Sequence, residues 1–136
     1  MKKKIAFICT GNSCRSQMAE GFAKHLFSKE WEAYSAGVSP NRIQSLTIQV
    51  MKEIGIDISN QYSKGLDAIP LKELDYCITL CDSAKTQCPV LPVSTKKEHW
   101  DIPDPYEWST DEKELLNKYR EVRDEIKKRI LEFKRR

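Results

Sequence analysis

The sequence predicts an α/β protein in which helices cover a parallel sheet, and two observations support this fold class. Short apolar or β-branched runs alternate along the chain with longer segments whose apolar residues recur every three or four positions. The first run, residues 5–8, is continuously apolar, which is typical of a strand buried on both faces of a parallel sheet. Such a sheet takes right-handed crossovers, so we expect a doubly wound sandwich.

Four short segments are predicted to be strands, and they are residues 5–8, 31–36, 75–80 and 96–100. Gly37 follows the second of them and should end it. In a doubly wound fold, ligands bind beyond the C-terminal ends of the strands. Cys9, Cys81 and Asp104 follow the first, third and fourth strands, so we expect these side chains to reach the same rim of the sheet.

Apolar stripes predict helices over residues 18–27, over residues 46–54 and from residue 109 towards the C-terminus. Gly55 is a plausible C-terminal stop for the second helix. The four residues 109–112 have the form of a capping box, which predicts Ser109 as the N-cap of the last helix. Residues 56–70 should be irregular with one helical turn near 66–69, and residues 81–92 should form a loop.

Composition places the chain among ordinary globular proteins. It has 136 residues, enough for one domain, with 40% hydrophobic and 32% charged residues and a net charge of +3. Basic and acidic residues of the last helix stand at i,i+4 spacing, which predicts a solvated helix face; the pairs are Glu114/Lys118, Asp124/Lys128 and Glu125/Arg129. No apolar run approaches a membrane span, and no signal peptide is evident. We therefore expect a cytoplasmic protein without a membrane partner. The net charge says nothing about nucleic acid; we expect no nucleic-acid partner and a monomer.

Cysteine usage points to reactive thiols. The chain has five cysteines, an odd number, and lacks a Cys-x-x-Cys pair, so neither a paired disulfide scaffold nor a structural zinc site fits. We expect no bound metal. Cys14 and Cys77 are expected to pack in the core.

The segment from Cys9 to Ser16 is predicted to be an anion-binding loop between a strand and a helix. Its backbone N–H groups and the helix N-terminus can wrap a tetrahedral oxyanion, and Arg15 adds a fork of donors. The predicted substrate-binding residues are Thr10, Gly11, Asn12, Ser13, Cys14 and Arg15. The same positive field should lower the thiol pKa of Cys9 and make it a nucleophile, with a hydrogen bond from the Ser16 hydroxyl. A simpler interpretation, a buried cysteine near a surface arginine, explains the segment less well.

Two further groups of residues could complete this chemistry. Asp104 stands between two prolines, which suits a positioned general acid, although an exposed Asp-Pro turn explains it equally well. Cys81 and Cys88 bracket a short segment next to a strand end. With Cys9 they could form a thiol relay that ends in a disulfide. Alternatively, Cys81 simply ends a buried strand and Cys88 is incidental.

The segment 9–21, Cys-Thr-Gly-Asn-Ser-Cys-Arg-Ser-Gln-Met-Ala-Glu-Gly, resembles the anion loop and first helix of thioredoxin-coupled arsenate reductases. Residues 78–81 with Cys88-Pro89 resemble the redox segment of that family. Residues 96–100 and Asp104-Pro105 resemble its fourth strand and acid loop. The resemblance implies a three-layer sandwich around a four-stranded parallel sheet, as in the low-molecular-weight tyrosine phosphatases.

The resemblance also implies a mechanism for arsenic detoxification. Cys9 would attack arsenate while Asp104 protonates the departing oxygen. Cys81 would then release arsenite and leave a Cys9–Cys81 disulfide, and Cys88 would convert it to a Cys81–Cys88 disulfide that thioredoxin reduces. Thioredoxin would be an external reductant, and weak phosphatase activity should remain.

Two features depart from the family pattern. Potassium can bind near the anion loop of family members through positions that match Asn12, Glu20 and Ser35, but Lys64 takes the place of the remaining acidic ligand. Its ammonium group would repel a cation or stand in for it. The form Asp104-Pro105-Tyr106 is usual in the phosphatase branch, so a protein tyrosine phosphatase is the alternative function. A redox sensor without turnover is a third hypothesis.

Overall fold

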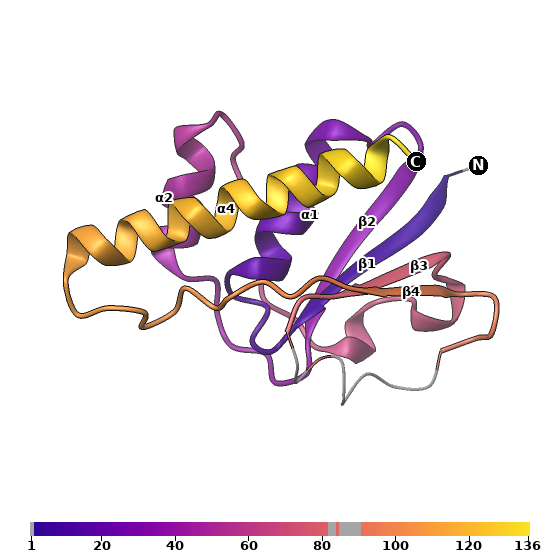
Figure 1. Ribbon diagram of the computed structural model, residues 1–136. Coiled ribbons are helices and arrows are strands. Elements are labelled where there is room, and N and C mark those ends of the chain that lie inside the picture. The colour runs from indigo at the N-terminus through magenta and orange to yellow at the C-terminus, as the bar shows by residue number, and fades with distance from the viewer. Residues whose placement is uncertain (1, 82–83, 85–90) are drawn as a thin grey trace.

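The computed structural model of the chain describes residues 2–81, 84 and 91–136. Its strands are β1 (Lys3–Cys9), β2 (Trp31–Gly37), β3 (Tyr76–Thr79) and β4 (Lys96–His99). They form one four-stranded parallel sheet in the order β2-β1-β3-β4 (Figure 1). The predicted fold class is confirmed, and each of the four expected strands lies within two residues of its predicted position.

Strand β1 is one of the two inner strands of the sheet, a place that suits a strand buried on both faces. Its residues from Ile5 to Cys9 are all buried, as a continuous apolar run requires. It pairs with β2 on one side and β3 on the other, so Ile8 faces Ala36 and Thr79 in the two neighbouring strands. The C-terminal ends of these strands therefore meet at one rim, directly beside Cys9.

Three helices, α1 (Arg15–Leu26), α2 (Ser45–Glu53) and α4 (Glu112–Lys134), lie on one side of the sheet (Figure 1). Helix α4 packs against both α1 and α2. The 3₁₀ turns η1 (Leu66–Ala68) and η2 (Leu71–Glu73) lie away from these helices, and η1 matches the predicted helical turn. None of the helices in the described part of the chain is long and apolar enough to cross a membrane.

The ends of two helices test the sequence predictions. Helix α2 is followed by Gly55 with a φ of 83°, which confirms the expected glycine stop. The predicted N-cap of α4 is wrong. Asp111, rather than Ser109, accepts hydrogen bonds from the backbone N–H groups of Lys113 and Glu114. Ser109 instead accepts the backbone N–H of Asp111, so it supports the cap from outside the helix.

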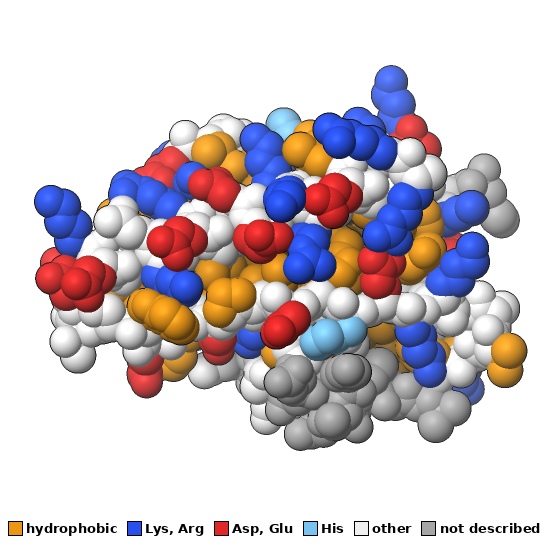
Figure 2. All heavy atoms as spheres, viewed as in Figure 1, with side chains coloured by type: hydrophobic (Ala, Val, Ile, Leu, Met, Phe, Trp, Pro, Cys, Tyr) orange, Lys and Arg blue, Asp and Glu red, His pale blue; other side chains and the backbone are white. Residues whose placement is uncertain are grey.

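The solvent face of α4 carries interspersed acidic and basic side chains (Figure 2). Of the three predicted i,i+4 pairs, Glu125 and Arg129 form an ion pair at 3.0 Å. Asp124 instead contacts the adjacent Arg123, whose guanidinium also reaches Glu53 of α2. Some charged side chains of this helix thus bind it to α2, and others form its solvated face.

Candidate active site

The site is built on the loop between β1 and α1. Strand β1 ends at Cys9, opposite Gly37 of β2. The chain then turns through Asn12, which adopts a φ of 51°, a left-handed conformation that asparagine tolerates better than most residues. Gly11, although a glycine, does not adopt a positive φ.

Cys9 lies at the base of this loop and is 2% exposed. Its sulfur is 2.8 Å from the hydroxyl oxygen of Ser16, as expected from the sequence. Burial raises the pKa of the Cys9 thiol above its ordinary value, while the Ser16 hydrogen bonds and the charge of Arg15 lower it. The expected net lowering of this pKa is therefore wrong, because the sequence pattern identifies the stabilising groups but not the burial that outweighs them.

Arg15 joins three parts of the chain. One guanidinium nitrogen, Nη1, donates to the carbonyl oxygens of Leu80 and Ile102 at 3.3 and 3.0 Å. The other, Nη2, lies 3.3 Å from a carboxylate oxygen of Asp104. Arg15 is buried, whereas the Asp104 side chain is about half exposed and accepts the backbone N–H of Tyr106. The structure thus brings Asp104 to the same rim as the anion loop.

Cys81 also reaches this rim. It is buried, and its sulfur is 3.1 Å from the hydroxyl oxygen of Thr10, the residue that follows the Cys9 nucleophile candidate. The backbone N–H of Ala84 donates to the same sulfur at 3.3 Å. Cys88 lies outside the described residues, so its predicted role as the third thiol stays a prediction.

The other two cysteines lie in the core, as the sequence predicts. Cys77 is 1% exposed on β3. Cys14 is 2% exposed, and its sulfur is 3.5 Å from the hydroxyl oxygen of Tyr119 on α4. Both side chains are therefore enclosed by the fold, so Cys14 could take its predicted part in anion binding only through its backbone.

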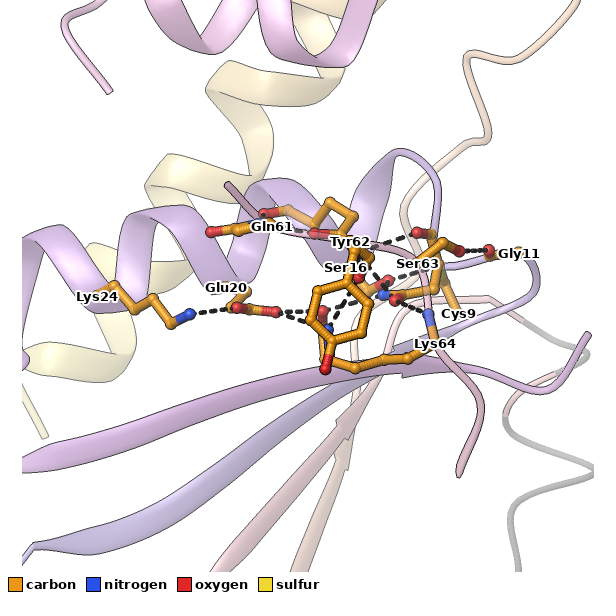
Figure 3. Close-up of polar contacts among 12 residues, drawn as sticks. Cys9, Gly11, Ser16, Glu20, Lys24, Gln61, Tyr62, Ser63 and Lys64 are labelled. Carbon is orange, nitrogen blue, oxygen red and sulfur yellow. Dashed lines mark hydrogen bonds and ion pairs between the residues drawn. The ribbon is translucent and has the colours of Figure 1, made fainter. Parts of the chain in front are cut away.

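Behind the loop, a polar network links Cys9 to residues far along the chain (Figure 3). The Asn12 amide donates to the hydroxyls of Ser16 and Ser35 at 2.7 and 2.9 Å. The hydroxyl of Ser63 donates to the backbone oxygen of Gly11 at 2.8 Å. Sequence reasoning did not identify three members of this network, Gln17, Gln61 and Ser63. Of these three, only Gln17 could have been suspected from the sequence, because it is a polar residue within the segment 9–21 that forms the loop and the start of the helix.

The residues that match potassium ligands in family members do not fit a cation here. The ammonium group of Lys64 is 3.6 Å from one carboxylate oxygen of Glu20, and that of Lys24 is 2.5 Å from the other. Ser35 donates its hydroxyl hydrogen to Glu20 as well. The charge of Glu20 is therefore compensated by the chain's own cations. Among the described residues, no group of three His, Cys, Asp or Glu side chains could hold a metal ion.

Comparison with known proteins places this site in a family. Residues 4–136 match the pattern of the family described as low molecular weight phosphotyrosine protein phosphatase. Arsenate reductase 1 of Staphylococcus saprophyticus is 48% identical over 137 residues, which cover 99% of this chain and 98% of that protein.

Solved structures give the same result. An arsenate reductase in the phosphate-binding state superposes with a TM-score of 0.79 at 36% identity, covering 96% of this chain and 95% of that one. A thioredoxin-dependent arsenate reductase of Corynebacterium glutamicum superposes with a TM-score of 0.76 at 29% identity, covering 98% of this chain and 61% of that one. The chain therefore belongs to the low-molecular-weight phosphotyrosine protein phosphatase family, and within it to the arsenate reductases.

Proposed function

We propose that this protein reduces arsenate to arsenite through a thiol relay of Cys9, Cys81 and Cys88, in one catalytic domain that spans residues 1–136. The observation that carries the proposal is the 3.1 Å contact between the Thr10 hydroxyl and the Cys81 sulfur. It places a second thiol against the loop that begins at Cys9, and hydrolysis of a phosphate ester has no need of that thiol. The names of the relatives support the same substrate.

In the first step, the Cys9 sulfur attacks arsenic and forms a sulfur–arsenic bond. One arsenic–oxygen bond breaks, and Asp104 protonates the oxygen so that it leaves as water. The buried Cys9 thiol can lose its proton to the substrate itself. A thiol beside a doubly charged oxyanion carries the same total charge as a thiolate beside a singly charged one, and one proton transfer interconverts them. Arg15 and the loop N–H groups would stabilise the charge in either form.

In the second step, the Cys81 thiolate attacks the Cys9 sulfur. The electron pair of the sulfur–arsenic bond stays on arsenic, which leaves as arsenite, and a Cys9–Cys81 disulfide forms. The two thiols thereby supply the two electrons that reduce arsenic from As(V) to As(III). Cys88 then attacks Cys81, which frees Cys9 and moves the disulfide to Cys81–Cys88. Thioredoxin would reduce this disulfide, as the thioredoxin-dependent relative from Corynebacterium glutamicum suggests.

Arsenite production with thioredoxin, thioredoxin reductase and NADPH tests the relay. Wild type should turn over repeatedly, whereas Cys88→Ser should stop after about one equivalent. Cys77→Ala is the matched control. Cys77 is a buried cysteine on β3, the strand that ends just before Cys81, but it has no part in the proposed relay. It should keep multiple turnover. Repeated turnover by Cys88→Ser with thioredoxin would contradict the proposal.

A tyrosine phosphatase activity is the second candidate. It is favoured by the 3.3 Å approach of Arg15 and Asp104, which brings together an anion-binding cation and a carboxyl group that can act as an acid once it is protonated, without any second cysteine. Tyr106 is 45% exposed directly after the Asp-Pro pair and could contact an aromatic substrate. Cys81→Ser should keep hydrolysis of aryl phosphates and lose arsenate reduction. If it loses both, the two activities are not separated as proposed.

We further propose that Lys64 takes the place of a potassium ion in this protein. Its ammonium group is largely buried beside Glu20 and is therefore weakly screened by solvent. A monovalent cation at the same position would meet a like charge. The protein should accordingly work without potassium.

A further inference from the structure

Gln17 stands out because it is a fully buried amide on the first turn of α1. Its side-chain nitrogen donates to the backbone oxygens of Asn12 and Tyr62 at 3.1 and 3.0 Å, and to the side-chain oxygen of Asn12 at 2.8 Å. Carbonyl oxygens only accept, so the NH₂ end of Gln17 must point towards them. Its oxygen accepts the side-chain N–H of Gln61 at 2.7 Å. Both ends of the Gln17 amide are thus fully used.

The orientation of the Asn12 amide follows from these contacts. The side-chain oxygen of Asn12 accepts hydrogen bonds from the backbone N–H of Lys64 at 3.0 Å and from Gln17. Its NH₂ group is therefore turned the other way, towards the hydroxyls of Ser16 and Ser35. A flipped amide would set an NH₂ group against two donors, so the observed orientation is fixed jointly by the backbone N–H of Lys64 and the side chain of Gln17.

The direction of donation then reaches Cys9. Because the Ser16 oxygen accepts a hydrogen from Asn12, its own hydroxyl hydrogen is available to donate to the Cys9 sulfur at 2.8 Å. The second hydrogen of the Asn12 amide goes to Ser35, whose hydroxyl accepts it and donates its own hydrogen to Glu20. Hydrogen bonds donated to a thiolate favour its charged form.

We propose that Gln17 is a positioning residue that, from behind the loop, sets the hydrogen-bond direction by which Ser16 stabilises the Cys9 thiolate. Gln17 acts through Asn12. Gln61, labelled in Figure 3, holds the Gln17 amide in place by donating to its side-chain oxygen, and it also donates to the backbone oxygen of Gln17. The inference rests on the proposed role of Cys9 as the nucleophile. It adds Gln17, which does not touch Cys9 itself and acts on it only through Asn12 and Ser16.

The test is the pH dependence of Cys9 alkylation by iodoacetamide, followed by mass spectrometry of the Cys9 peptide. Gln17→Met keeps the length of the side chain and removes its polar atoms. The midpoint of its pH profile should rise by about half to one unit relative to wild type, which is about a threefold to tenfold loss of thiolate at a fixed pH below the midpoint. The midpoint, not the maximal rate, is the readout, because altered access to the sulfur changes only the maximal rate.

Thr95→Val is the matched control. It removes another buried hydrogen bond, from the Thr95 hydroxyl to the backbone oxygen of Leu74 at 2.7 Å, away from the loop. It should lower thermal stability and leave the Cys9 midpoint unchanged. An unchanged midpoint in folded Gln17→Met overturns the inference. If Gln17→Met does not fold, Gln61→Met replaces it, with a smaller upward shift expected and no shift overturning the inference.

Failure of the proposed function would look different. If wild-type Cys9 shows no pH-dependent alkylation, or if phosphate does not protect it, the assignment of Cys9 as the nucleophile fails. If wild type shows a normal pH profile and the variants have the same midpoint, Cys9 keeps its assignment as the nucleophile and only the positioning role of Gln17 is refuted.

Discussion

Gly37 of β2 should control the conformation of the predicted anion loop, because it lies directly against the loop backbone. A Cβ atom at Gly37 would lie 2.7 Å from the backbone oxygen of Thr10, 2.8 Å from the backbone nitrogen of Asn12 and 2.9 Å from the carbonyl carbon of Gly11. All three are loop backbone atoms, which cannot turn aside as a flexible side chain can. In Gly37→Ala, the loop or β2 must therefore shift by several tenths of an ångström.

Two magnitudes follow from this clash. Overpacking of this kind costs about 1–3 kcal/mol of unfolding free energy. For a chain of this size, that is a fall in melting temperature of about 4 °C per kcal/mol. Because a misplacement of about 1 Å in a site can cost about 10²-fold in rate, the smaller shift here should weaken anion binding about tenfold. Isothermal titration with phosphate and urea denaturation measure the two effects separately.

Gly55→Ala is the control for this substitution. Gly55 has a φ of 83°, and the described residues leave open space around its Cβ position. Alanine there should cost about 1–2 kcal/mol through backbone strain alone and leave phosphate affinity unchanged. If Gly37→Ala is folded and binds phosphate as tightly as wild type, the loop is not held by its close approach to β2.

Three further predictions concern single side chains. Asp104→Asn should lower phosphatase kcat by about 10²–10⁴-fold, and less for aryl esters whose leaving group needs no proton; an equal loss across leaving groups in steady-state assays would count against an acid. For Lys64→Asp, we expect a higher melting temperature in potassium chloride than in choline chloride, whereas wild type should melt at the same temperature in both. A potassium effect on the melting temperature of wild type would refute the proposal that the Lys64 ammonium group takes the place of potassium beside Glu20. Asp111→Ala should lower the unfolding free energy by about 1 kcal/mol in urea denaturation, and Ser109→Ala by less; the reverse order would make Ser109 the N-cap.

The fold class was predictable because its signals are local. A continuous apolar run at residues 5–8 and the apolar stripes of the three helices depend only on near neighbours in the sequence. The N-cap of α4 was missed because both Ser109 and Asp111 are good caps, and only the backbone conformation decides which side chain meets the free N–H groups.

The meeting of Cys9, Cys81 and Asp104 at one rim was also predictable, since parallel strands end at the same edge of their sheet. The structure brings these segments together through Thr10 and Arg15, with contacts at 3.1 and 3.3 Å. That result needed only the order of strands and loops. The relay itself, which includes Cys88, remains a prediction.

By itself, then, the sequence determined the α/β fold, the position of the loop between β1 and α1 and the residues at its rim, because motif and periodicity are properties of adjacent residues. Only the tertiary structure decided how the loop is held. The contacts of Gly37, the orientation of Gln17 and the pairing of Lys64 with Glu20 join segments that are distant in sequence. The same holds for the pKa of the Cys9 thiol, because burial is set by how the whole chain packs around it.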